Sequence, residues 1–261
     1  MTGPVELTVQ GGVAHIVVGD GRRRGALPTA AWVDLARAFE RIGETAGPRA
    51  AVIRGRGEDF CAGSDLNEWR WATDAAVEES FAAMESAFTA IERCPAPVVA
   101  EVRGVAAGAG CQLALACDLR YIAESGRIGM PIVRLGILTS VRFAARMTAL
   151  VGLSLTRELL YTGALVDGVE AARCGLATRA VPDADLDGAV NGLLDRILAQ
   201  PAEAVCAAKR STSLAIRPVP DSHQRAVAIT DFRQAISAFL ETGDPGILYE
   251  ASAGARDAAV P

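Results

Sequence analysis

The chain has 261 residues, of which 51% are hydrophobic and 5% aromatic, so it can bury a large aliphatic core in a layered α/β fold. Its 26 basic and 31 acidic residues give a net charge of −5, which provides no general attraction for nucleic acid or for an anionic membrane. Neither partner is predicted.

The predicted elements alternate between strands and helices in the first half of the chain. Residues 5–9 and 13–18 are typical of two strands joined at Gly11-Gly12, and a helix begins after Thr29 and ends at Gly43 or Gly47. This order predicts a mostly parallel sheet with crossover helices. The later expected elements are strands at 50–53, 98–102 and 119–123, helices at 74–93 and 111–117, and a mostly helical remainder.

Two glycine-containing turns stand out, CAGSDL at 61–66 and GVAAGAGCQL at 104–113. Each turn follows an apolar strand-like run and leads into a helix-like segment. Small residues let the main chain come close to a ligand, and the start of a helix adds positive dipole character. The pair of turns therefore predicts two backbone N–H groups that point at one ligand oxygen.

The cysteines show no paired spacing typical of metal ligands, and several lie in apolar runs. We therefore expect free thiols and no metal site. The first ten residues contain no apolar signal core, and no stretch approaches the roughly 20 apolar residues of a membrane span, so we predict a cytoplasmic location. The cysteines are Cys61, Cys94, Cys111, Cys117, Cys174 and Cys206.

Both turns and their flanks resemble the crotonase superfamily, also called the enoyl-CoA hydratase/isomerase family. Residues 54–66, RGRGEDFCAGSDL, are similar to the family pattern G-x-x-F-x-A-G-x-D-[IL]. Residues 97–113, PVVAEVRGVAAGAGCQL, followed by CDLR at 117–120, are similar to P-V-[IV]-A-x-[IV]-x-G-x-[AC]-x-G-G-G-x-E-[IL] with C-D-[IL]-R. Further matches lie at 25–27 and 166–181. The resemblance runs from about Val5 to about Ala208.

The resemblance implies an α/β fold of the crotonase (ClpP/crotonase-like) class, a spiral of ββα units with a helical C-terminal trimerisation region. Residues 1–200 would form the spiral core with the acyl-CoA pocket, and residues 201–261 a helical assembly region. A homotrimer or a dimer of trimers is therefore expected. The assembly region carries an apolar stripe at helical spacing: Ala226, Ile229, Phe232, Ile236 and Phe239.

The implied ligand is an acyl-CoA thioester, as in fatty acid metabolism, with coenzyme A as part of the substrate and no separate cofactor. By resemblance, the backbone N–H groups of Ser64 and Ala109 are the two oxyanion donors, a role that needs no side chain. For the arginines of the basic loop at 22–24, an exposed solubilising cluster is the alternative interpretation. The implied CoA contacts are Arg22, Arg24, Ala26, Ala62, Gly63, Asp65 and Leu66.

Two departures from the family pattern concern acid/base chemistry. Hydratases of the family use two glutamates, whose positions are occupied here by Gln112 and Ile132. Neither an amide nor an alkyl chain transfers a proton near neutral pH, so ordinary hydration is not expected. The family's usual glycine-rich loop is also replaced, by LTSVR at 138–142.

The sequence leaves two functions open: an acyl-CoA-processing enzyme with a non-standard acid/base set, or a non-catalytic acyl-CoA binder or carrier. The roles of Glu68, Ser140 and Arg142 also stay open. Glu68 would belong either to the acyl pocket or to a solvated helix face. Ser140 lacks a histidine nearby in the sequence, and we expect both histidines, His15 and His223, to be structural.

Overall fold

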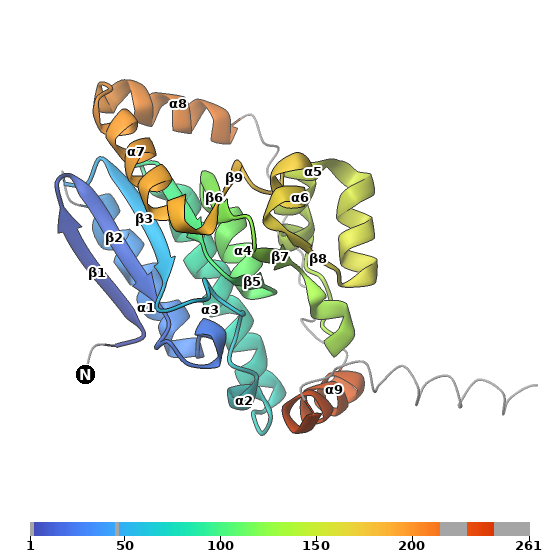
Figure 1. Cartoon of the computed structure of the whole chain (residues 1–261). Helices are drawn as coiled ribbons and strands as arrows, with labels where there is room; N and C mark the ends of the chain where they lie inside the picture. The colour runs from blue at the N-terminus through green and yellow to red at the C-terminus, as the bar shows by residue number, and fades with distance from the viewer. Residues whose placement is uncertain (1–2, 45–46, 215–228, 243–261) are drawn as a thin grey trace, which may run out of the picture.

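The computed structural model describes residues 3–44, 47–214 and 229–242 (Figure 1). Within these ranges the main sheet has six strands in the order β1-β2-β3-β4-β6-β9. The first pair is the antiparallel hairpin predicted around Gly11-Gly12, and all later neighbours are parallel. The strands are β1 (Val5–Gln10), β2 (Val13–Val18), β3 (Ala50–Gly55), β4 (Val98–Val102), β6 (Leu119–Ala123) and β9 (Arg179–Val181).

Helices cover both faces of this sheet (Figure 1). Helices α1 (Thr29–Glu44) and α3 (Asp74–Arg93) pack over one face, and α7 (Leu186–Leu198) packs over the other. Consecutive residues of a strand point to opposite faces, so Ile53 lies in the larger core under α1 and α3, whereas Val52 lies in the smaller core under α7. Burial on both faces explains the continuous apolar runs of the parallel strands.

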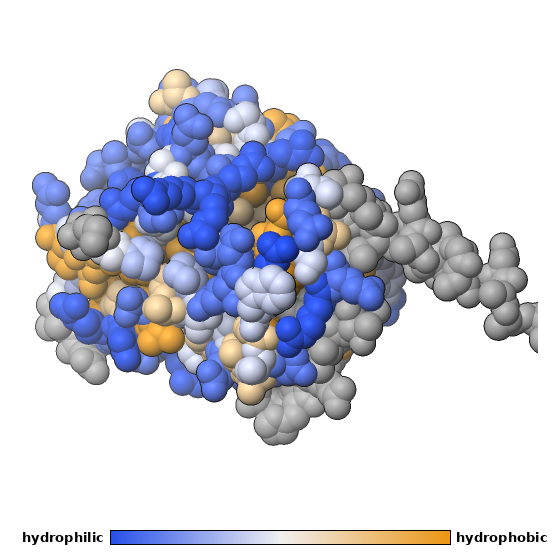
Figure 2. All heavy atoms as spheres, turned by 90° about the horizontal axis from the view of Figure 1, so that it is seen from below, coloured by the Kyte–Doolittle hydropathy of each residue, from blue (hydrophilic) through white to orange (hydrophobic). Residues whose placement is uncertain are grey.

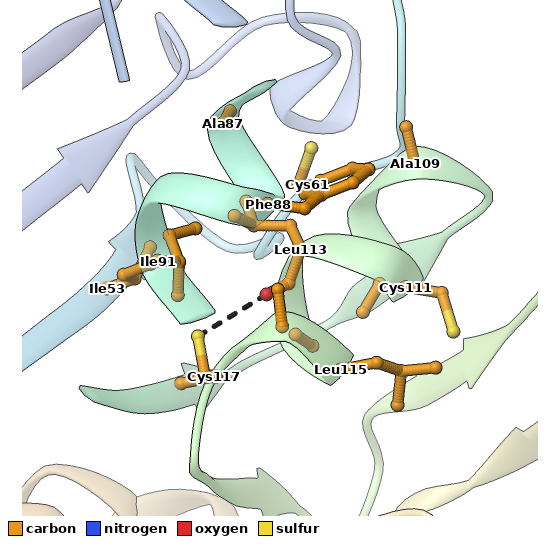
Figure 3. Packing of buried hydrophobic residues seen from close by; sticks show 14 of the residues in the cluster. Ile53, Cys61, Ala87, Phe88, Ile91, Ala109, Cys111, Leu113, Leu115 and Cys117 are labelled. Carbon is orange, nitrogen blue, oxygen red and sulfur yellow. Dashed lines mark hydrogen bonds between the residues drawn. The ribbon is translucent and has the colours of Figure 1, made fainter. Parts of the chain in front are cut away.

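A second sheet of three strands carries the second glycine turn. Its order is β5-β7-β8, with β5 (Val105–Ala107) parallel to β7 (Arg127–Gly129) and β7 antiparallel to β8 (Leu165–Asp167). Helix α4 (Ala109–Ala116) begins directly after β5, and all of its residues are buried. Figure 3 shows α4 beside α3, with Leu113 near Phe88 in the larger core. The units β1-β2-α1 and β4-β5-α4 are ββα units, as predicted.

The predicted strands and the helix at 74–93 are confirmed. The prediction of a mostly helical remainder missed the short strands β7, β8 and β9. Each has only three residues, too few to show a hydrophobic period. The helices of this half are α5 (Val141–Thr162), which is broken at Gly152, α6 (Gly168–Arg173), α7 and α8 (Ala202–Leu214).

The last described helix is α9 (Ile229–Thr242). It packs against α2 (Leu66–Trp69) and the short helix η2 (Pro131–Leu135), and its Ile236 is 1% exposed. The chain itself therefore covers part of the predicted apolar stripe. Ala226 and the side chains at 229 and 232 lie outside the described residues, as does His223, and assembly into trimers stays a prediction. No helix in the described ranges is both long and apolar enough to cross a membrane.

Candidate active site at the two glycine turns

The two glycine turns are joined by main-chain hydrogen bonds. The N–H of Cys61 donates to the Val105 carbonyl at 2.9 Å, and the N–H of Ala107 donates to the Cys61 carbonyl at 3.0 Å. The first turn thus runs parallel to β5 and extends the second sheet by an isolated bridge between Cys61 and Ala106. Segments that lie far apart in the sequence are side by side here, as the sequence predicts.

Glycines permit this close approach. A Cβ atom on Gly110 would lie 1.8 Å from the Cys61 carbonyl oxygen, so no side chain fits there. A Cβ atom on Gly63 would lie 2.9 Å from the Ala107 oxygen and 3.3 Å from the Ala109 nitrogen, and Gly63 has a φ of +107° that L side chains rarely adopt. The first turn is therefore in contact with the residue that begins α4.

The main-chain N–H groups of Ser64 and Ala109 donate no hydrogen bond within the described part of the chain. Their neighbours do: the Asp65 N–H donates to the Leu27 carbonyl at 2.9 Å, and the Gly108 N–H donates to the Gly129 carbonyl at 3.0 Å. Ala109 is the first residue of α4, where a helix has no internal acceptor for its N–H groups and where its dipole is positive. The structure brings two unused donors to one place.

Gln112 lies one turn further along α4 and is fully buried. Its Nε2 donates to the Phe143 carbonyl at 3.3 Å and lies 3.5 Å from the Met130 sulfur. Its Oε1 has no hydrogen-bond partner among the described residues. The side chain therefore connects α4 to the start of α5 and leaves one acceptor unused.

Ile132 lies in η2 and is 6% exposed. Its Cγ2 is 3.7 Å from the position that a Cβ on Gly108 would take, so an alkyl group lies beside the second turn.

Sulfur groups also lie close to the two turns. The Ser64 hydroxyl donates to the Met84 sulfur at 3.0 Å, and burial raises the pKa of the Cys61 and Cys111 thiols to about 12. These thiols stay protonated at neutral pH.

The carboxylates near the first turn already have partners. Asp65 caps α2 by accepting the Asn67 N–H at 3.1 Å. Glu68 is exposed and accepts the N–H and the hydroxyl of Thr29, at 2.7 and 2.9 Å, so it caps the start of α1. No sequence pattern predicted this cap, because the two residues are distant in the chain.

The basic loop is held against the first turn by ion pairs. Arg23 pairs with Asp65 at 2.7 Å, and Arg24 lies 3.5 Å from Asp59. Both arginines have positive φ angles, 46° and 55°, which are uncommon for side chains other than glycine. The Ala62 N–H also donates to the Arg24 carbonyl. The loop that we expect to contact CoA, from Arg22 through Ala26, thus lies directly beside residues 62–66.

Ser140 caps α5, because its hydroxyl accepts the Phe143 N–H at 3.1 Å. The role of Arg142, left open above, includes an ion pair: Arg142 lies 3.4 Å from Glu85 on α3, and Arg146 also pairs with Glu85. A groove of about 580 Å³ lies between α1, α3 and Arg142, but none of the predicted site residues lines it.

Ion pairs and a hydrogen bond hold helix α9 beside this site. Arg233 donates to the Ala72 carbonyl and pairs with Asp74, both at 2.8 Å, and Glu241 pairs with Arg70 at 3.0 Å. The residues that pair with α9 lie just after α2 in the chain, and α9 also contacts η2, which carries Ile132. Seen from below, the surface is mostly hydrophilic with smaller hydrophobic areas (Figure 2). No sequence pattern predicted these ion pairs.

The Enoyl-CoA hydratase/isomerase family profile matches residues 8–245. The human mitochondrial Delta(3,5)-Delta(2,4)-dienoyl-CoA isomerase is 32% identical over 73% of this chain and 60% of its own length. Crotonyl-CoA hydratase of Syntrophomonas wolfei is 28% identical over 88% of this chain and 92% of its own length. The chain spans only 48% to 61% of the length of several other curated relatives that it matches, among them an enoyl-CoA isomerase/hydratase of Mycosarcoma maydis and one hydratase of Arabidopsis thaliana.

Solved structures show the same fold. The enoyl-CoA hydratase of Mycobacterium smegmatis superposes with a TM-score of 0.79 at 29% identity, covering 98% of this chain and 97% of that one. An enoyl-CoA hydratase-type protein of Thermobifida fusca, solved in complex with CoA, superposes with a TM-score of 0.76 at 32% identity, covering 91% and 92%. The predicted crotonase fold is therefore confirmed.

Proposed function

Because the chain belongs to the enoyl-CoA hydratase/isomerase family, we propose that it processes an acyl-CoA thioester whose carbonyl oxygen lies between the Ser64 and Ala109 N–H groups. The observation that supports this proposal most is the pair of unused main-chain donors at the contact of the two glycine turns. The CoA complex of the Thermobifida fusca relative supports the choice of ligand.

The two donors favour a reaction that passes through a thioester enolate. Negative charge develops on the carbonyl oxygen in such a reaction, so fixed N–H groups stabilise the transition state more than the bound substrate. Each such donor contributes about 3–4 kcal/mol in acyl-transfer enzymes. Ile132 and the Met84 thioether keep water away from the thioester oxygen. The stabilisation by the two N–H groups is then stronger, because few water dipoles compete for that oxygen.

The acid/base set is non-standard. The amide of Gln112 and the alkyl chain of Ile132 do not exchange protons, and the Cys61 and Cys111 thiols keep theirs. Asp65 and Glu68 are occupied as helix caps. Neither the two substituted positions nor these thiols supply a proton-transfer group, so we expect crotonyl-CoA hydration to be far slower than in relatives with two glutamates.

Infrared spectroscopy of bound butyryl-CoA, labelled with ¹³C at the thioester carbonyl, tests this proposal. The carbonyl band should move to lower wavenumber on binding, because two N–H groups polarise the bond. Gly63→Ala should reduce the shift, since the new Cβ would lie 2.9 Å from the Ala107 oxygen and 3.3 Å from the Ala109 nitrogen, and the two turns would have to move apart. Gly188→Ala in α7 is the matched control, because nothing lies within 4 Å of its Cβ. An unshifted band in the wild type contradicts the proposal, and a shift without turnover of any enoyl-CoA supports the non-catalytic binder.

A further inference from the structure

The direction of the Ser64 N–H is set by Leu27. The Gly63 carbonyl and the Ser64 N–H belong to one planar trans peptide group, so they point in opposite directions. The Leu27 N–H donates to that Gly63 carbonyl at 2.8 Å, and the Leu27 carbonyl accepts the Asp65 N–H at 2.9 Å. Leu27 and Ser64 thus form an isolated parallel bridge, and Leu27 itself is fully buried. The Ser64 N–H therefore points away from Leu27, toward the side on which a ligand is expected.

The loop before Leu27 has a backbone conformation that needs support. Arg23 and Arg24 have φ angles of 46° and 55°, in the left-handed region that is unfavourable for residues with a side chain. Gly25 follows with a φ of 72°, which glycine adopts readily. Such strain persists only where the surrounding contacts hold it. The contacts that hold the two arginines therefore affect the placement of Leu27.

Arg23 is attached to the first glycine turn at Asp65. Its Nη1 lies 2.7 Å from Asp65 Oδ2, and the Asp65 side chain is only 9% exposed. The other oxygen, Oδ1, accepts hydrogen bonds from the Asn67 N–H and from the Asn67 side-chain amide, both at 3.1 Å. The loop is thus joined to the turn at both of its ends, by this ion pair at Arg23 and by the main-chain hydrogen bonds of Leu27. Two points of attachment resist a rotation that one point would allow.

We propose that Arg23 is a positioning residue, which holds the Ser64 N–H in the direction of the thioester oxygen through its ion pair with Asp65. This role rests on the proposed function, because it takes that N–H to be an oxyanion donor. A hydrogen bond weakens steeply as its angle departs from linearity, so a small rotation of the 63–64 peptide is sufficient to reduce the polarisation of the carbonyl. Arg22 and Arg24 stay the expected CoA contacts of the basic loop, whereas Arg23 acts on the protein chain itself.

Two substitutions break this ion pair and change the local charge in opposite directions. Arg23→Met removes a positive charge, whereas Asp65→Asn removes a negative charge and keeps an oxygen for the α2 cap. With the full-length protein and ¹³C-labelled butyryl-CoA, the carbonyl band shift should fall to about half in both variants, because one of the two N–H groups is misdirected. Arg103→Met is the matched control: it removes an ion pair of 3.0 Å to Asp187 on α7 and should leave the band unchanged.

Free CoA, which has no thioester carbonyl, separates positioning from attraction of the ligand. If Arg23 only attracted the CoA phosphates, Arg23→Met would weaken calorimetric binding of free CoA, Asp65→Asn would strengthen it, and both variants would keep the full band shift. A full shift in either variant, folded by circular dichroism, overturns the role of Arg23, and the wild-type shift then still supports the proposed function. Where one variant does not fold, the other decides. An unshifted band in the wild type instead means that the proposed function itself fails.

Discussion

The substitution Arg120→Met tests how the buried end of α4 is held. Arg120 is 4% exposed, and its guanidinium donates to the Leu176 carbonyl at 2.9 Å and to the Cys117 carbonyl at 2.7 Å. A third contact, to Ala114, is at the 3.5 Å limit. The side chain thus connects the C-terminal end of α4, where carbonyls lack helical partners, to the segment after α6.

The two short hydrogen bonds of Arg120 determine how much stability the substitution is expected to cost. Hydrogen bonds from a charged donor contribute about 1.5–3 kcal/mol each, so their loss alone costs about 3–6 kcal/mol. The buried charge of Arg120 is poorly solvated, which lowers its pKa, and a methionine removes that desolvation penalty while it fills a similar space. We therefore expect the free energy of unfolding to fall by about 2–4 kcal/mol, because buried carbonyls remain unpaired.

Urea unfolding at pH 7, followed by circular dichroism at one protein concentration, measures this change. Arg127→Met is the matched control: Arg127 is exposed and donates one bond, of 3.3 Å, to the Leu165 carbonyl, so its loss should change stability by less than about 0.5 kcal/mol. Equal stabilities of the two variants would refute the reasoning, because they would mean that burial cancels the whole contribution of the Arg120 hydrogen bonds.

Three further predictions concern other parts of the fold. Gly110→Ala should leave little soluble protein, because its Cβ would lie 1.8 Å from a carbonyl oxygen, whereas Gly188→Ala should express normally; soluble expression of both variants would contradict the clash. Burial raises the pKa of Glu101 to about 6, so the folded state binds the proton more tightly and stability falls by roughly 2 kcal/mol as pH rises from about 4.5 to 6; this fall should be absent in thermal melts of Glu101→Gln. Arg233→Ala should increase amide hydrogen exchange in α9 and leave α3 protected, and unchanged exchange in α9 would show that its ion pairs do not hold it.

The sequence predicted the fold well where one physical signal was sufficient. The helix at 74–93 shows a clear apolar period, and the hairpin shows its Gly11-Gly12 turn, so both are confirmed. Strands β7 to β9 were missed because three residues carry no period. Pairing between distant segments decides such strands, and one sequence does not show it.

For the candidate site, the sequence predicted from their small residues that the two turns present main-chain N–H groups together, and the structure places the turns side by side. It did not predict the partners of the side chains. Glu68 caps a helix that starts far away in the chain, and the Gln112 amide is fixed by a main-chain carbonyl at Phe143, a group that every residue type carries. Contacts to main-chain atoms do not depend on the residue type, so they cannot be predicted from the sequence and are seen only in the structure.

The use of main-chain amides has a consequence for how such a chain changes over generations. Every residue except proline carries an N–H, so exchanging the side chain at 64 or 109 does not delete the group. The glycines at 63 and 110 are the vulnerable positions, because they set the distance between the two segments. Mutations can therefore change the side chains at positions 112 and 132 while the two amides persist in an unchanged frame.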